Sequence, residues 1–360
     1  MSETEKTNVA SSAQANRQRA PGESTRVDTL RGLGCILVVA FHAIGAESHT
    51  GLHVPDSSAY RGFCNLLMHV RMPLFAFLSG YVYSLWPVAP GCLAAFVQKK
   101  MRRLVIPLLT VTSIYYLLTK LLPYDKAVPA PAEFWRIYLF PFAQFWFLQA
   151  MILIFALVAV LDGFKLLDRI GRYWLAYGLA VLGCIGVRVQ IDLFSIDHML
   201  ELLPFFLLGL GVVRFRSWLA ERRTGTVCLL VWVALMGWYA FDLFVAGGPM
   251  IPKRTAFSLL LGTSGVLALL HWFPSMSGLA FIGRSSFAIF LYHAFFTAGT
   301  RQAMAAIGFS TMRLMEFSLS LLAGVAGPMV VEYRVGRIPW LAGPLLGQAA
   351  PLHETAHATR

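Results

Sequence analysis

Residues 30–43 read LRGLGCILVVAFHA, an apolar run in which Arg31 and His42 are the only basic side chains. If the run is a membrane-spanning helix, a rise of about 1.5 Å per residue places His42 roughly 16 Å from Arg31. We therefore expect Arg31 near one membrane face and His42 near the middle of the membrane. An ionisable residue at that depth is costly and usually functional. Histidine also suits proton transfer near neutral pH.

The whole chain has the composition of a membrane protein. It is 57% hydrophobic and 13% charged over 360 residues, whereas a soluble protein has about 25% charged residues. Apolar segments near the ~20 residues that span a bilayer recur along the chain, which predicts an all-α, polytopic bundle of about ten membrane helices. The expected spans are 30–47, 63–86, 103–122, 143–161, 172–190, 199–214, 225–245, 255–272, 284–302 and 312–333.

The basic residues predict how the chain is oriented. Sorting the 30 Lys and Arg residues by loop gives an excess of about two to one on the side that holds both termini, which predicts that both termini are cytoplasmic. Because the net charge of +12 is spread over these loops, it argues against a nucleic-acid partner. We expect a disordered tail over 1–25, a membrane domain over 26–340 and a cytoplasmic tail over 341–360.

His42 has two interpretations. It is either a buried histidine satisfied by a hydrogen bond, or a general base that deprotonates a hydroxyl group. Glu47 either orients the His42 imidazole or lies free at the outer surface, and His293 either assists His42 or only packs. The five scattered cysteines show no metal-site spacing, so we expect no metal.

Positive charge gathers at the expected cytoplasmic side. Lys99, Lys100, Arg102 and Arg103 place four cations within five residues, which suits either phosphate groups or anionic lipid. Arg31 is either a membrane anchor or a ligand for an anion that enters from the cytoplasm.

Three residues are candidates for the opposite side of the membrane. His69 and Arg71 lie near the outer end of the second expected span, where they face either water or a substrate cavity. Trp146 opens the fourth span, where it belongs to an aromatic belt or stacks on a sugar ring.

Several motifs occur in the order found in membrane acyltransferase family 3, and the chain resembles that family over about residues 26–340. The family's first helix has an arginine and a histidine separated by ten residues, which fits Arg31 and His42. In the cluster at 99–103, lysine replaces the first arginine of a family motif. The other similar motifs are Met72–Phe75, Ser79–Tyr81, Trp146–Leu148, Leu203–Gly209 and Leu291–His293.

The resemblance implies a membrane O-acyltransferase of a bacterial inner membrane. Such an enzyme moves an acyl group, usually acetyl, from cytoplasmic acyl-coenzyme A to a hydroxyl of an extracytoplasmic or lipid-linked glycan, such as exopolysaccharide or O-antigen. Acyl-coenzyme A is then a co-substrate rather than a bound cofactor. It would be held by Arg31 and the cluster at 99–103, with His42 as general base.

Two other functions stay open at this point. A secondary transporter would use His42 and His293 as a proton relay, although no internal repeat supports it. A lipid-sensing or scaffold protein would use every polar site structurally. Membrane lipid is an expected partner in each case, and the sequence predicts no oligomeric state.

Overall fold

The computed structural model describes residues 21–85, 93–121, 128–187, 191–215, 221–308 and 312–348. These residues form helices and no strand, which confirms the all-α class. The longer helices are α2 (Pro21–Ile44), α4 (Met68–Leu85), α6 (Ile106–Leu121), α8 (Trp146–Gly163), α9 (Ile170–Gly186), α10 (Ile196–Arg214), α12 (Arg222–Phe241), α13 (Ala256–Trp272), α15 (Ser286–Ala306) and α16 (Arg313–Val335). The shorter elements are α3 (Ala59–Leu66), α5 (Leu93–Lys100), α7 (Arg136–Leu139), α14 (Ser277–Arg284) and α17 (Pro339–Leu346), the π-helical turns η1 (Met101–Val105) and η5 (Asp242–Ala246), and the 3-10 turns η2 (Pro131–Glu133), η3 (Ala143–Phe145) and η4 (Leu193–Ser195).

The helices are those of a multi-pass membrane protein, but the expected count of ten spans is not confirmed. Among the described residues, seven helices are long and apolar enough to cross a membrane. An eighth span results if α14 and α15, which are bent by 80°, count as one. The two remaining expected spans are the apolar helices α9 and α13. Each has 17 residues, fewer than the ~20 that a bilayer usually requires.

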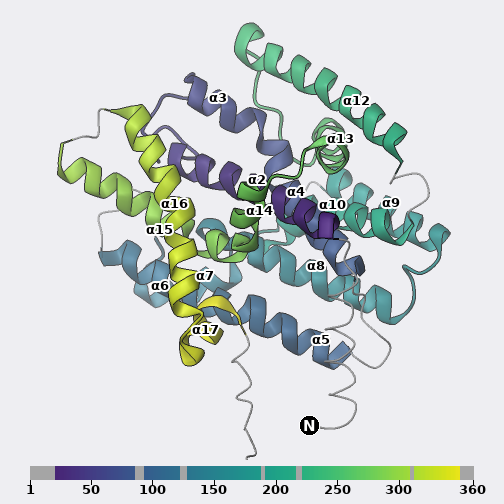
Figure 1. Ribbon diagram of the computed structural model, residues 1–360, viewed down its shortest axis with the longest axis horizontal. Coiled ribbons are helices and arrows are strands. Elements are labelled where there is room, and N and C mark those ends of the chain that lie inside the picture. The colour runs from purple at the N-terminus through teal and green to yellow at the C-terminus, as the bar shows by residue number, and fades with distance from the viewer. Residues whose placement is uncertain are drawn as a thin grey trace, which may run out of the picture.

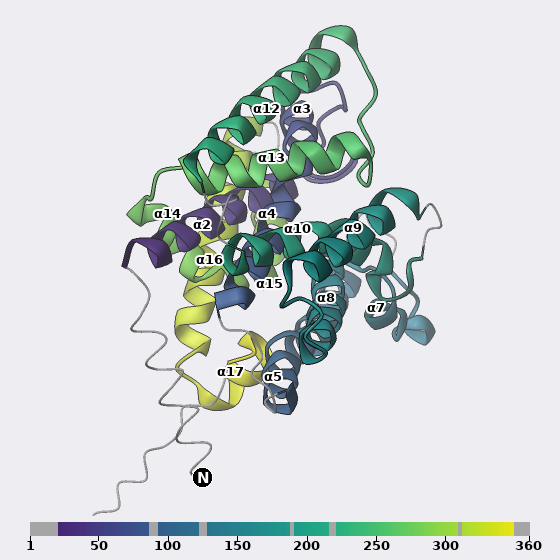
Figure 2. The same ribbon diagram turned by 90° about the vertical axis from the view of Figure 1, so that its right-hand side faces the viewer.

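Helices α2 and α4 lie at the centre of the bundle (Figure 1). α2 packs against α4, α14, α15 and α16, and α4 packs against α10 and α13. α12 lies on α13 at one side of the molecule, whereas α5 and α17 lie on the opposite side (Figure 2). Within the 18-residue apolar stretch of each helix, 61% is buried inside the protein in α2 and 6% in α12. α12 therefore faces outward, whereas α2 is among the helices that the protein encloses most.

A pair of glycines lets α4 and α10 touch at the backbone. A Cβ atom at Gly80 would overlap the carbonyl group of Phe206, and a Cβ atom at Gly209 would overlap that of Phe77. Both phenylalanines are fully buried beside the contact. Small residues at helix contacts are the usual means of close packing in membranes, where no hydrophobic effect draws helices together.

Both ends of the described bundle differ from the expected spans. α2 begins at Pro21 rather than near Leu30. α17 ends at Leu346, and the Tyr292 hydroxyl donates a hydrogen bond of 2.8 Å to the Leu345 carbonyl, which ties α17 to the bundle. Residues 1–20 and 349–360 lie outside the described residues, so the two tails stay a prediction.

We expect Gly80→Ala to lower the unfolding temperature of the detergent-solubilised protein. The added methyl group must push α4 from α10, and overpacking of this kind costs about 1–3 kcal/mol. Gly178→Ala in α9 is the matched control, because nothing lies within 4 Å of a Cβ atom there and helix propensity favours alanine by up to about 1 kcal/mol. Equal unfolding temperatures for the two variants, measured by circular dichroism, would show that the α4–α10 contact is looser than described.

Candidate functional site

Helix α2 carries Arg31 near its middle and His42 in its last turn. The two residues are eleven positions apart, which corresponds to about 16 Å along the helix axis. His42 therefore lies close to the end of its helix, which differs from the expected position midway along a span. Arg301 of α15 donates a hydrogen bond of 3.4 Å to the His42 carbonyl. Arg31 pairs with Asp28, one turn earlier, at 3.3 Å.

A second glycine pair sets α2 against α14. A Cβ atom at Gly32 would overlap the carbonyl of Leu279, and one at Gly283 would overlap that of Asp28. The backbones therefore meet directly beside Arg31. Arg284, the last residue of α14, follows this contact at once, so the packing brings two arginines from distant parts of the sequence to one cavity.

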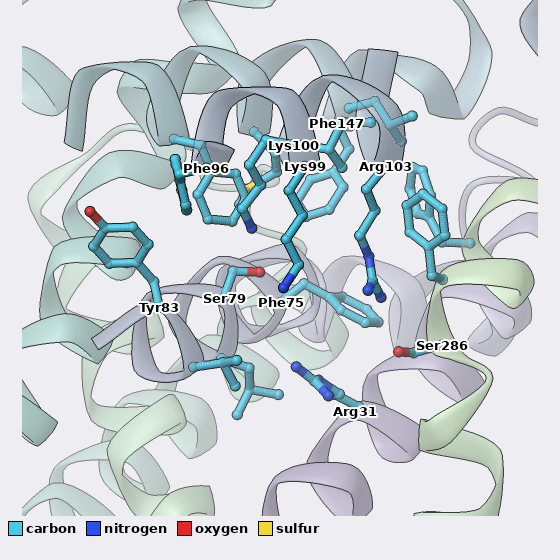
Figure 3. A pocket seen from close by; sticks show the side chains of 18 of the residues that line it. Arg31, Phe75, Ser79, Tyr83, Phe96, Lys99, Lys100, Arg103, Phe147 and Ser286 are labelled. Atoms are coloured by element: carbon cyan, nitrogen blue, oxygen red, sulfur yellow. The ribbon is translucent and has the colours of Figure 1, made fainter. Parts of the chain in front are cut away.

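That cavity, called here the cationic cavity, has a volume of about 470 Å³. Figure 3 shows Lys99, Lys100 and Arg103 on one side of it and Arg31 on the other, with the charged groups of Arg31 and Arg103 directed into the space between them. Ser79 and Ser286 add hydroxyl groups. The basic residues that line it are Arg31, Lys99, Lys100, Arg103 and Arg284, and the aromatic ones are Phe75, Tyr83, Phe96, Phe147, Phe155, Phe287 and Phe290.

The expected cluster at 99–103 divides between the cavity and its surroundings. Lys99, Lys100 and Arg103 line the cavity, but Arg102 does not. Arg102 and Arg103 both belong to the π-helical turn η1, and as neighbours in sequence their side chains leave the helix in different directions. The backbones of both residues lie beside Gly347. Arg102 is therefore the one member of the predicted donor set that the structure places outside the cavity.

Two cations of the cavity make cation–π contacts with aromatic rings. The Lys100 ammonium lies 3.5 Å from the centre of the Phe155 ring, and the Arg103 guanidinium lies 5.4 Å from that of Phe287. Rings attract cations without neutralising them. The cavity therefore combines positive charge with apolar walls, which suits a ligand that has both anionic and apolar parts.

His42 lines a second cavity, called here the histidine cavity, of about 140 Å³. Phe290 of α15 lines both cavities. Its ring lies 5.3 Å from that of Phe147, which lies 6.3 Å from that of Phe75. The residues that line the histidine cavity are Val38, Phe41, His42, Arg71, Met72, Gln144, Trp146, His198, Lys253 and Phe290.

The structure brings His42 and His293 together. Their ring centres are 4.7 Å apart and the planes are tilted by 53°. His293 is fully buried, and its Nδ1 atom lies 2.8 Å from the Ile289 carbonyl. A carbonyl oxygen only accepts hydrogen bonds, so Nδ1 carries the proton and the neutral ring has its lone pair on Nε2. Within the described part of the chain, that Nε2 atom has no hydrogen-bond partner.

Glu47 belongs to the turn that follows α2. Its carboxylate is 65% exposed and lies 2.8 Å from Nε2 of His49. Of the two interpretations of Glu47, this position favours the outer surface, because a strongly exposed carboxylate is free to move and holds a neighbouring ring poorly.

Arg71 is only 6% exposed and lines the histidine cavity. No carboxylate of the described residues forms an ion pair with it, and its guanidinium lies 3.7 Å from the centre of the Phe41 ring. A desolvated cation–π contact contributes about 2 kcal/mol, whereas taking a charge out of water costs several kcal/mol. Phe41 therefore offsets only part of the cost of burying this charge.

The other two candidates for the outer side differ from each other. Trp146 lines the histidine cavity, with the His198 ring centre 4.2 Å from its own. The two ring planes are tilted by 32°, and the adjacent imidazole limits the room for a sugar ring on that face. His69 lies outside the cavity. It is buried with its ring centre 5.6 Å from that of Tyr239.

Among the lining residues that were not singled out from the sequence as site residues, four have nitrogen-containing side chains. Arg284 lines the cationic cavity, and Gln144, His198 and Lys253 line the histidine cavity. Arg284 and Lys253 were counted only as loop charges, and they join the site through helix packing. Among the residues that the structure describes, no group of three or more His, Cys, Asp or Glu side chains could hold a metal ion.

A comparison with protein families finds one that matches most of this region. The model of acyltransferase family 3, described as an acyltransferase domain, matches residues 24–333, a range that contains every residue lining the two cavities. No curated protein and no solved structure matches the chain. The match supports the resemblance seen in the sequence motifs and gives no support to a transporter.

We expect the neutral His293 ring to be protonated at Nδ1, because that atom faces the Ile289 carbonyl. Nitrogen NMR of protein labelled with ¹⁵N-histidine would show the tautomer directly, and His293→Leu would identify the signal. A signal from a ring protonated at Nε2 alone would contradict the hydrogen bond that orients this side chain.

Proposed function

Because the chain belongs to acyltransferase family 3, we propose that it moves an acyl group from acyl-coenzyme A to a hydroxyl group of a glycan. The observation that carries the proposal is the pair of cavities that share Phe290. One cavity is rich in cations and the other contains His42. Two substrates that approach from opposite sides can meet at that boundary.

The cationic cavity suits the acyl donor. Coenzyme A carries phosphate groups, which arginine binds through paired hydrogen bonds and lysine binds as a point charge. Arg31, Arg103 and Lys99 supply both kinds of cation from opposite walls (Figure 3). The aromatic walls suit the uncharged arm that ends in the thioester. In this proposal the thioester lies near Phe290 and the phosphates lie among the cations.

The orientation predicted from the basic residues agrees with this assignment. The excess of Lys and Arg on the side of both termini predicts that Arg31 and the cluster at 99–103 face the cytoplasm, where acyl-coenzyme A is found. His42 then lies toward the outer side. We propose the inner membrane of a bacterium as the location, with a surface glycan or lipid-linked glycan as acceptor and acetyl as the acyl group.

His42 acts as general base in the proposed reaction. Its imidazole takes the proton of the acceptor hydroxyl while the hydroxyl oxygen attacks the thioester carbonyl. The carbon–sulfur bond then breaks, and the coenzyme A sulfur takes the proton back from His42. An ester of the acceptor and free coenzyme A are the products, and the enzyme returns to its starting state. No covalent acyl-enzyme is required.

His293 supports this step without contact to the substrates. The Nε2 lone pair, left by the hydrogen bond from Nδ1 to Ile289, lies in the ring beside that of His42. A lone pair in a buried environment stabilises the positive charge that His42 gains when it takes a proton. The arrangement follows the general pattern of a base oriented by a third group.

We expect His42→Ala to lower acyl transfer from radiolabelled acetyl-coenzyme A by about 10²- to 10⁴-fold, the usual contribution of a general base. Binding of coenzyme A, measured separately, should stay at the wild-type level because His42 lies outside the cationic cavity. His49→Ala is the matched control, since that ring is exposed beside Glu47. Unchanged transfer by His42→Ala would exclude the assigned base.

We expect Arg103→Glu to weaken coenzyme A binding and to raise KM for the donor by at least about tenfold, because charge-assisted hydrogen bonds are lost and repulsion is gained. Arg102→Glu, one residue away but outside the cavity, is the matched control and should have a much smaller effect. Equal effects of the two variants in a titration would show a diffuse basic patch that attracts lipid or donor unselectively.

A further inference from the structure

The histidine cavity has basic and neutral lining residues and no acidic one among the described residues. Arg71 and Lys253 supply two cations. The Glu201 carboxylate lies 3.5 Å from the Lys253 ammonium and lines, with Lys253 and His69, a neighbouring small cavity rather than the histidine cavity. The wall that faces His42 therefore carries positive charge that the protein only partly balances.

Arg71 differs from the other enclosed arginines of the bundle. Arg214 lies 2.7 Å from a carboxylate oxygen of Asp162. Arg254 lies 3.0 Å from one of Asp197 and also bonds to backbone carbonyls at the end of α9. Arg61 binds the Gly45 carbonyl and lies 3.4 Å from Asp56. The protein thus supplies an acceptor to each of these three, whereas Arg71 has the Phe41 ring and an open cavity.

Two more buried nitrogen atoms of the cavity wall have no hydrogen-bond partner among the described residues. Gln144 is 3% exposed, and its Nε2 atom has no hydrogen-bond partner among the described residues. The Nδ1 atom of His198 is likewise buried without a partner there. Buried polar groups in native structures are normally satisfied. The unmet Gln144 amide, together with a His198 ring that donates from Nδ1 when that atom carries a proton, points to a ligand that accepts hydrogen bonds.

We propose that the histidine cavity binds an oxyanion, a carboxylate or a phosphate, that belongs to the sugar being acylated. The oxyanion pairs with Arg71 and Lys253 and accepts hydrogen bonds from Gln144 and His198. This inference rests on the proposed function, because it makes the bound sugar the acceptor whose hydroxyl lies beside His42. It restricts the acceptor class to acidic glycans, such as those that contain a uronic acid or a sugar phosphate.

The test measures equilibrium binding of three probes to the full chain in detergent by isothermal titration calorimetry. Methyl glucuronide and methyl glucoside differ only in the carboxylate, and methyl glucoside 6-phosphate carries the other oxyanion. At least one anionic probe should bind about tenfold more tightly than the neutral glycoside, since hydrogen bonds to charged groups are the stronger ones. The comparison of the two anions shows which one the cavity prefers.

Two variants test whether the preference for anionic probes arises in the histidine cavity. Arg71→Gln and Lys253→Gln should each remove most of the preference for the anionic probe and leave the weak affinity for methyl glucoside unchanged. Arg136→Gln is the matched control, because Arg136 is exposed beside Glu133 and lies outside both cavities. Wild-type binding of coenzyme A by each variant confirms that it is folded.

Several results would overturn the inference. These are equal binding of charged and neutral probes to the wild type, an anion preference that survives Arg71→Gln, or an equal loss in Arg136→Gln. If Arg71 served only to stabilise charge that develops on the thioester, Arg71→Gln would slow transfer and leave probe binding unchanged, which also overturns it.

Failure of the oxyanion subsite can be distinguished from failure of the proposed acyl transfer. Acyl transfer from acetyl-coenzyme A with no preference for anionic acceptors would leave the acyltransferase assignment intact and remove only the oxyanion subsite. Arg71-dependent binding of methyl glucuronide by a protein that transfers no acyl group would keep the subsite and remove the proposed reaction.

Discussion

The backbone contact between Gly32 of α2 and Gly283 of α14 is the constraint on which both halves of the site depend. A helix is a rigid rod over a few turns, so fixing α2 at Gly32 also fixes Arg31 beside it and His42 ten residues on. The 80° bend after α14 then lets α15 pack along α2. That packing brings His293 against His42.

The aromatic boundary between the two cavities meets a physical requirement of the proposed reaction. Two polar cavities that met directly would form a continuous path for water and ions. Phe290 lines both cavities, and its ring lies beside that of Phe147, which lies beside Phe75, so apolar rings line the cationic cavity next to the residue that the two cavities share. In the proposed reaction only the thin uncharged arm of the donor has to reach this boundary, while its phosphates remain among the cations.

The sequence predicted those parts of the site that lie within one helix or one short run. The spacing of Arg31 and His42 needs only the helical rise, and the charges at 99–103 are visible as a run. Arg102, expected from the run to bind the donor, does not line the cationic cavity, because a run of charges does not show which of its side chains share a face of the helix. His198 and Lys253 join His42 only through the packing of α10 and of the segment before α13. No local pattern of residues contains that information.

The bend between α14 and α15 is a feature that hydropathy alone does not reveal. The expected span at 284–302 corresponds to α15, which is one continuous helix from Ser286 to Ala306, but the chain bends by 80° at the start of this helix. The break turns the first residues of α15 toward the cationic cavity, which Ser286 and Phe287 line. A helix N-terminus carries partial positive charge and free backbone N–H groups. An unbroken span would place this end at a membrane surface, whereas the break adds it to the charges of Arg31 and Arg284, where an anionic donor would bind.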